Sequence, residues 1–225
     1  MKEIFIHHPY TKEQIPNEDV VLVLGYFDGV HLGHQEVIQR GREIAKRLGV
    51  KLALLTFNHH PSIVFDKPNI KTKMPLLSSK RKAEIIRNLG VDTYYVVDFT
   101  SQFSQLTPQE FVDQYIIGLH ARVAVGGFDY TFGDPRVASI QNMSFYAKGK
   151  FEVEIVSVFK KNDQKVSSSK IRVLLDVGNV EEANKLLGYP YETTGIVVHG
   201  EARGRQIGYP TANLEWKGTV RLPKV

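Results

Sequence analysis

The stretch "VVLVLGYFDGVHLGH" (residues 20–34) decides the fold. Its first half is an unbroken apolar run of strand length, which is typical of a strand buried on both faces of a parallel sheet. Gly25 and Gly29 follow, and glycine lets a backbone turn sharply and approach a ligand closely. His31 and His34 then stand where a helix is expected to begin, and the free N–H groups of a helix N-terminus attract anions. The stretch predicts an anion site at the carboxyl end of a central strand.

Strand and helix patterns alternate on both sides of this stretch. Apolar residues recur at helical spacing as far as Leu48, and Gly49 is a plausible stop. Further strands are predicted at 51–57, 93–99, 122–127 and 151–158, and further helices at 78–90, 108–119 and from 167 onward. Apolar and polar residues alternate more in the run 151–158 than in the other strands, which predicts a strand nearer an edge of the sheet. The alternation predicts an α/β fold with a doubly wound parallel sheet.

The pattern changes after about residue 186. The stretch "TTGIVVHGEARGRQIGYPTANLEW" (193–216) is rich in glycine and has no helical period. We therefore predict two domains, residues 1–186 and residues 187–225, the second being an incomplete β-barrel-type segment. Residues 189–225 are too few to close a barrel around a core of their own.

Composition excludes several classes of protein. The 225 residues include 42% hydrophobic ones and no cysteine, so the chain is of ordinary globular type and holds no disulfide or thiolate metal site. No apolar run is long enough to span a membrane, and the N-terminus lacks the apolar centre of a signal peptide. A cytoplasmic location is expected. The net charge of +5 suits anionic partners, but the basic residues are scattered among acidic ones, so small phosphate-bearing substrates are preferred to nucleic acid.

A second segment, "SSSKIR" (167–172), follows a late strand and opens an amphipathic helix. Serine caps and an arginine one turn inside the helix suit a pyrophosphate. Zinc is not expected at His31 and His34, because no third ligand has matching spacing.

These motifs resemble those of a known superfamily. The spacing G-x-F-D-G-x-H-x-G-H is similar to the H-x-G-H nucleotidyltransferase signature, and "VSSSKIR" (166–172) resembles the I-S-S-T-x-I-R motif, with Val166 and Ser169 as departures. The segments "TFNHHPSIVF" (56–65), "VGGFDYTFG" (125–133) and "GRQIGYPTANL" (204–214) resemble the prokaryotic bifunctional riboflavin kinase/FMN adenylyltransferases. The resemblance runs along nearly the whole chain, in the family's order.

The resemblance implies transfer of AMP from ATP to the phosphate of FMN, which gives FAD and pyrophosphate with Mg²⁺ bridging phosphate oxygens. His31, His34 and Arg172 would be catalytic, the histidines stabilising the α-phosphate and the leaving group and Arg172 holding the β- and γ-phosphates. The ATP-binding residues implied are Gly25, Phe27, Asp28, Gly29, His31, His34, Ser168, Ser169 and Arg172. Asp28 serves equally well to cap its own turn. The FMN-binding residues implied are Phe57, His60, Pro61, Phe128, Asp129, Tyr130 and Phe132.

The kinase-type signature for ATP and Mg²⁺ comprises Gly204, Arg205, Pro210, Thr211 and Asn213, with Thr211 and Asn213 as the metal ligands. In the family, later strands carry the catalytic carboxylate, so phosphorylation of riboflavin is not expected of this chain. The incomplete segment could be completed by another chain through its strand edges, which would make an oligomer.

Two other functions stay open on the sequence. One is another H-x-G-H transferase, acting on a pantetheine or nicotinate phosphate. The other is a flavin-nucleotide-binding protein without turnover. Incubation with FMN, ATP and Mg²⁺, with FAD and pyrophosphate measured as products, distinguishes these functions from FMN adenylyl transfer.

Overall fold

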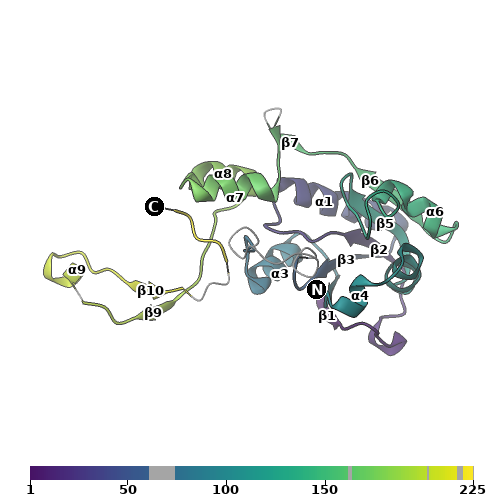
Figure 1. Ribbon diagram of the computed structural model, residues 1–225, viewed down its shortest axis with the longest axis horizontal. Coiled ribbons are helices and arrows are strands. Elements are labelled where there is room, and N and C mark those ends of the chain that lie inside the picture. Colours follow the sequence, from purple (N-terminus) through teal and green to yellow (C-terminus); the bar gives the residue numbers. More distant parts are fainter. Residues whose placement is uncertain (61–73, 162–163, 202, 217–219, 225) are drawn as a thin grey trace.

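The computed structural model describes residues 1–60, 74–161, 164–201, 203–216 and 220–224. Its centre is a six-stranded parallel sheet with the order β1-β4-β3-β2-β5-β6 (Figure 1). The strands are β1 (Lys2–Ile6), β2 (Val20–Leu24), β3 (Lys51–Phe57), β4 (Thr93–Val97), β5 (Ala121–Gly127) and β6 (Glu152–Val156). The predicted doubly wound parallel sheet is confirmed, and β6 lies at an edge as its alternating pattern indicated.

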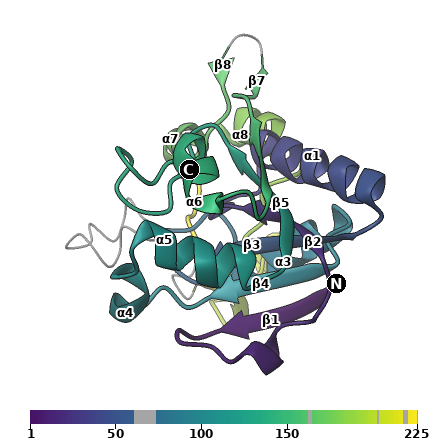
Figure 2. The ribbon, with the colours of Figure 1, turned by 90° about the vertical axis from the view of Figure 1, so that its right-hand side faces the viewer.

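Strand β2 is buried along its whole length because helices cover both faces of the sheet. Val21 and Val23 face α1 (Leu32–Leu48) and α3 (Ser79–Asn88), whereas Leu22 and Leu24 face the opposite layer. That layer consists of α4 (Ser101–Ser104), α5 (Pro108–Phe111), η3 (Val112–Ile117), η4 (Ile140–Asn142) and α6 (Met143–Ala147) (Figure 2). The continuous apolar run in β2 is thus explained by two apolar layers.

The strand order places the predicted site. From β2 the chain moves through β3 to β4 and then returns to β5 on the other side of β2. The order therefore reverses between β2 and β5, and in open α/β sheets ligands bind at such a reversal, beyond the carboxyl ends of the strands. The loop that begins at Gly25 lies there.

The predicted helix at 108–119 is regular only at its start. Thr107 and Glu110 form a capping box around Pro108, but the helix passes into π-helical geometry over Val112–Ile117. The buried side chains Tyr115 and Ile116 fill the core from this segment.

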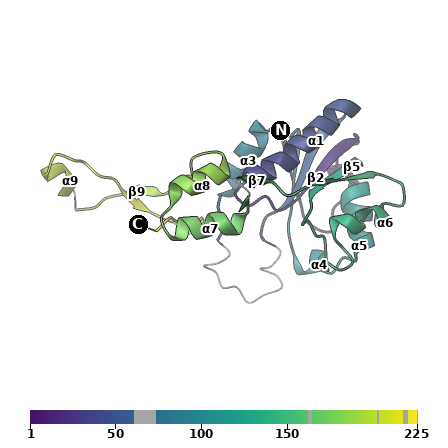
Figure 3. The ribbon, with the colours of Figure 1, turned by 90° about the horizontal axis from the view of Figure 1, so that it is seen from above.

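The C-terminal part begins with α7 (Ser168–Asp176) and α8 (Val180–Leu187). An antiparallel pair of strands, β9 (Ile196–Val198) and β10 (Asn213–Glu215), then projects from the body with α9 (Arg203–Gln206) at its tip (Figures 1 and 3). We call residues 196–215 the arm. All three residues of β9 are exposed, and the described residues of the arm form a hairpin with a short helix that the sequence did not predict.

After the arm the chain returns to the body. The Arg221 guanidinium pairs with the Asp176 carboxylate, with its Nε 2.8 Å from Oδ1, and the Lys224 N–H bonds to the Leu175 carbonyl at 3.0 Å. The predicted domain boundary at 186/187 falls at the end of α8 and stays a prediction. Short elements complete the list: η1 (Lys12–Gln14), β7 (Lys160–Lys161) and β8 (Gln164–Lys165). In the described part of the chain, no helix has the length and apolar character needed to cross a membrane.

We expect Gly41→Ala to destabilise the fold, because a Cβ at Gly41 would lie 2.5 Å from Cγ2 of Val23, where α1 crosses β2. Overpacking of this kind typically costs about 1–3 kcal/mol. The measurement is urea unfolding followed by circular dichroism. Gln39→Ala, an exposed change on the same helix, is the control and should leave stability unchanged within about 0.5 kcal/mol. Equal stability of both variants would mean that α1 and β2 can separate without cost.

Candidate functional site

The loop between β2 and α1 has an unusual backbone. Phe27, Gly29 and Val30 have φ angles of 55°, 78° and 33°. A left-handed conformation is costly for a β-branched residue such as Val30, so packing must hold it in place, and Val30 is fully buried. Gly29 is required for its conformation. Gly25 is required for space, because a Cβ there would lie 2.8 Å from the Phe27 ring.

His31 and His34 stand at the N-terminus of α1. His31 is the N-cap, and its Nδ1 accepts a hydrogen bond from the His34 N–H at 3.3 Å. The two rings stack with their centroids 3.6 Å apart and 14° between their planes. The Phe27 and His34 rings form a T-shaped pair with their centroids 5.3 Å apart, which holds the histidines against the loop.

Both histidines are neutral in this site. Burial lowers the pKa of His31 to about 4, and it lowers the pKa of His34 well below its usual value, with a further push from His31. Because Nδ1 of His31 accepts a hydrogen bond, the single proton of the neutral ring lies on Nε2. Nδ1 of His34 is buried and has no hydrogen-bond partner among the described residues. The pair can therefore donate hydrogen bonds to an anion without first carrying charge.

The Asp28 carboxylate joins three segments. It accepts a hydrogen bond from the Leu76 N–H at 2.8 Å and pairs with the Arg172 guanidinium, while the Asp28 main-chain carbonyl accepts from Ser168 Oγ at 2.8 Å. Asp28 is only 6% exposed. It does not cap its own turn. Instead it fastens the loop to α7 and to the residues before α3.

The sequence motif at 167–172 opens α7 as predicted. Ser167 is the N-cap, and its side chain accepts from the Lys170 N–H. Ser168 reaches Asp28, so the N-terminus of α7 meets the same loop as the N-terminus of α1. Arg172 bonds through Nε to the Met74 carbonyl at 3.4 Å as well as to Asp28. In this arrangement the guanidinium is engaged by protein groups, and its predicted contact with the β- and γ-phosphates stays a prediction.

Residues near α8 hold the loop from behind. Gln35 Nε2 donates to the carbonyls of Val30 and Leu187, each at 2.8 Å, and the Tyr189 hydroxyl donates to the Gly29 carbonyl. The Gln35–Leu187 and Tyr189–Gly29 contacts could not be predicted from the sequence, because their partners are 152 and 160 residues apart.

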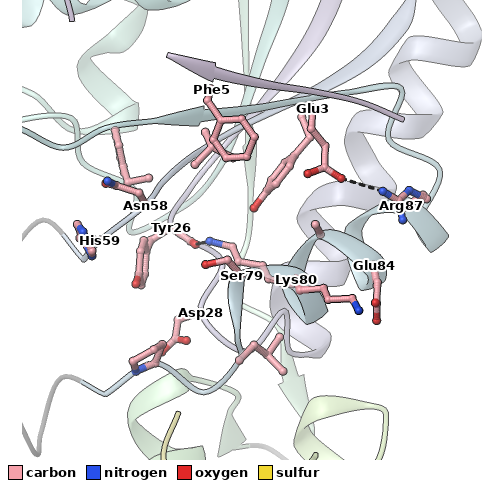
Figure 4. Close-up of a pocket in the computed structure, with 17 residues that line it drawn as sticks. Glu3, Phe5, Tyr26, Asp28, Asn58, His59, Ser79, Lys80, Glu84 and Arg87 are labelled. Carbon is pink, nitrogen blue, oxygen red and sulfur yellow. Dashed lines mark hydrogen bonds and ion pairs between the residues drawn. The ribbon is translucent and has the colours of Figure 1, made fainter. Parts of the chain in front are cut away.

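A cavity of about 510 Å³ opens beside the loop, between α3 and strands β3, β4 and β1 (Figure 4). Its labelled lining includes Tyr26, Asp28, Asn58, His59 and Phe5, and the Glu3–Arg87 ion pair lies on the side away from Asn58 and His59. Of the predicted FMN-binding residues, Phe57 lines this cavity. His60 lies next to it, with its ring edge-on to Tyr26 at 4.9 Å. Pro61 lies outside the described residues.

The other predicted FMN-binding residues lie after β5 and do not line this cavity. Phe132 stacks on Phe111 in the core with centroids 5.5 Å apart, and Tyr130 packs against the same cluster. Phe128 is 37% exposed, with Lys165 Nζ 4.6 Å from its ring centre, and Asp129 pairs with Lys165 at 2.8 Å. The structure thus divides the predicted flavin wall between two places.

The kinase-type residues lie in the arm. Gly204 and Arg205 belong to α9, and Thr211 Oγ1 lies near Gly204, where a Cβ would come within 3.0 Å of it. The Asn213 side chain packs against Gly200, and Pro210 is exposed. Within the described residues, no group of three or more His, Cys, Asp or Glu side chains could hold a metal ion.

The sequence reading missed Lys82. It lies on the buried face of α3 with Ala83, Ile85 and Ile86, is 8% exposed and lines the cavity. The sequence feature that could have identified it is a lysine within the apolar stripe of an amphipathic helix, where charged residues are rare.

Comparison with known proteins places the chain among flavin-nucleotide enzymes. The FAD synthetase family model matches residues 13–170, and the riboflavin kinase family model matches residues 187–224. A bifunctional riboflavin kinase/FMN adenylyltransferase of Listeria monocytogenes is 46% identical and aligns with 100% of this chain and 71% of its own length. That of Bacillus subtilis is 43% identical, with 99% and 70% covered.

Two solved structures share the fold. A protein of Streptococcus pneumoniae described as a macrolide-efflux protein superposes with a TM-score of 0.88 at 39% identity, covering 98% of this chain and 71% of that one. A pantoate–β-alanine ligase of Francisella tularensis superposes with a TM-score of 0.50 at 12% identity, covering 83% and 85%. The second likeness is one of fold alone.

The buried, neutral His31 predicts acid-sensitive stability. An unfolded histidine binds a proton below a pH of about 6.5, whereas native His31 does so only near pH 4. Between these values the unfolded state binds more protons, so the free energy of unfolding should fall as the pH falls through this window, by roughly 1–3 kcal/mol from His31. Urea unfolding at pH 7.5, 6 and 5 measures it. In His31→Asn, which keeps an N-cap acceptor, the slope should be smaller. An unchanged slope would exclude His31 as its source.

The pairing of Asp28 with Arg172 predicts strong coupling between them. Arg172→Met should destabilise by about 3 kcal/mol or more, because it leaves a buried carboxylate without its cation. Adding Asp28→Asn should recover part of the loss, so the double-mutant cycle should give a coupling energy of about 1–3 kcal/mol. The exposed Arg122–Asp19 pair is the control, for which at most about 1 kcal/mol is expected. Similar coupling in both pairs would show that the Asp28 pair behaves as a surface ion pair.

Proposed function

Because the chain belongs to the FAD synthetase family of bifunctional riboflavin kinase/FMN adenylyltransferases, we propose that it transfers the adenylyl group of ATP to FMN, forming FAD and pyrophosphate. The observation that carries the proposal is the stacked pair His31 and His34 at the N-terminus of α1, with the N-terminus of α7 fastened to the same loop. Two helix N-termini and two neutral imidazoles suit a triphosphate.

In this reaction, an oxygen of the FMN phosphate forms a bond to the α-phosphorus of ATP. The bond from that phosphorus to the oxygen bridging the β-phosphate breaks, and pyrophosphate leaves with the electron pair. The nucleophile is already an anion, so the protein needs no covalent intermediate. Its work is to align the two phosphates and to stabilise the charge that develops.

His31 is suited to the second task. Its Nδ1 is occupied by the His34 N–H, so Nε2–H is the donor that remains for a phosphate oxygen. The His34 ring, which stacks on His31, would donate a second hydrogen bond to the phosphates. An anion bound at this point would favour the protonated form of either ring, and the low pKa of His31 leaves room for such a rise. Ser168, Ser169 and Arg172 would bind the outer phosphates from α7.

We write magnesium as part of the substrate, MgATP. The described residues offer no cluster of metal ligands at the loop, and the Asp28 carboxylate is already bonded to Leu76 and Arg172, so the triphosphate oxygens and water would hold the ion. When bound, it neutralises charge on the leaving pyrophosphate.

The test is incubation of the protein with FMN, ATP and Mg²⁺, with FAD and pyrophosphate measured as products. His31→Asn should fold, because asparagine keeps the N-cap, yet kcat should fall by about 100- to 1000-fold, the usual cost of one lost transition-state donor. His199→Asn, an exposed histidine in the arm, is the matched control and should keep full activity. FMN binding by the wild type without FAD formation would indicate a flavin-nucleotide-binding protein. Full activity of His31→Asn would remove His31 from the reaction.

A further inference from the structure

Lys82 is a buried cation whose hydrogen-bonding partners carry no charge. Its Nζ donates to Thr56 Oγ1 at 2.8 Å and to the Tyr26 main-chain carbonyl, and it lies 4.7 Å from the centre of the Tyr26 ring. Among the ion pairs of the described residues, none includes Lys82. Burying an ammonium group is costly unless an anion compensates it, so its position calls for an explanation beyond packing.

The carboxylate that acts electrostatically on Lys82, Asp28, is already bonded to other groups. The Asp28 carboxylate bonds to the Leu76 N–H and the Arg172 guanidinium. Burial lowers the pKa of Lys82 to about 7, and Asp28 offsets only part of that effect. The lysine is therefore available to an anion that the described residues of the chain do not provide.

The surroundings indicate where that anion would bind. Lys82, Tyr26 and Asp28 all line the cavity beside the loop, and His34 senses the Lys82 charge, which helps to lower its pKa. The Lys82 ammonium is therefore close enough to His34 to affect its pKa. It lies between α3, which carries it, and Thr56 of β3, to which it donates a hydrogen bond. The histidines themselves stand at the start of α1, several residues further along the loop.

Adenylyl transfer requires two anionic phosphates to approach each other. A cation close to the His31 and His34 site, but outside it, reduces the repulsion between the two phosphates and orients the attacking oxygen. We propose, on the premise of the function proposed above, that Lys82 binds the phosphate of the acceptor FMN at the inner end of this cavity. Thr56 and Tyr26 are then positioning groups, which aim the ammonium by occupying two of its three N–H bonds.

The experiment compares Lys82→Met with Lys80→Met in the full chain. Lys80 lies on the same helix and lines the same cavity, but it is exposed, so its removal changes the net charge equally. For Lys82→Met we expect a KM for FMN at least tenfold higher and a KM for ATP within twofold of wild type. Lys80→Met should leave both within twofold. An unchanged KM for FMN in folded Lys82→Met overturns the inference.

Inhibition by riboflavin, which lacks the phosphate, distinguishes an effect of Lys82 on phosphate binding from an effect on the shape of the cavity. Its inhibition constant against FMN should be the same in wild type and Lys82→Met. If riboflavin and FMN weaken equally, Lys82 only shapes the cavity and the inference is wrong. If Lys82→Met does not fold, as judged by circular dichroism, Lys82→Gln, whose amide can still donate to Thr56, must give the same selective rise for FMN. Absence of FAD formation by the wild type would overturn the proposed function, whereas wild-type kinetics in the Lys82 variants would overturn only this inference.

Discussion

The pairing of one buried carboxylate with groups from two distant segments is the constraint on which the site depends. Asp28 follows the central strand, yet its partners Leu76 and Arg172 lie 48 and 144 residues further along the chain. Without Arg172, the Asp28 charge would be buried alone, which is among the more costly arrangements in a protein. Because the Asp28 main chain also receives Ser168, the N-terminus of α7 is held against the loop. The two helix N-termini are thus brought together by contacts of Asp28 within the protein.

The same loop separates two electrostatic environments. At the start of α1, His31 and His34 are neutral donors made so by burial. At Tyr26, the main-chain carbonyl accepts from both Thr56 and Lys82, and the ammonium lies against the cavity. The strained backbone at Phe27 and Val30 lies between them and turns successive groups in different directions. Successive residues of this short loop thus contact different neighbours.

Much of this architecture could be predicted from local patterns. The apolar run at 20–24, the glycine stop at Gly49 and the serine cap of the 167–172 motif are local signals, and each corresponds to a real element. The histidine pair was predicted because its spacing is local too. The partners of Asp28, the Tyr189 contact and the Lys82 cation were not, because each depends on which segments meet in three dimensions. The predicted FMN-binding residues lie in two places for the same reason: Phe57 lines the cavity, whereas the partly buried Phe132 stacks on Phe111 of the core.

The separation of 140 residues between Asp28 and Ser168 also has a consequence for synthesis. All six strands of the sheet are complete once Val156 has been made, so a nascent chain of that length contains the whole central layer. The contacts of Asp28, however, require Ser168 and Arg172 in α7, which follow all six strands along the chain. Contacts of such long range close late because the loop between them must first be ordered. We therefore expect the loop at Asp28 to be fastened to α7 only after the central sheet has formed.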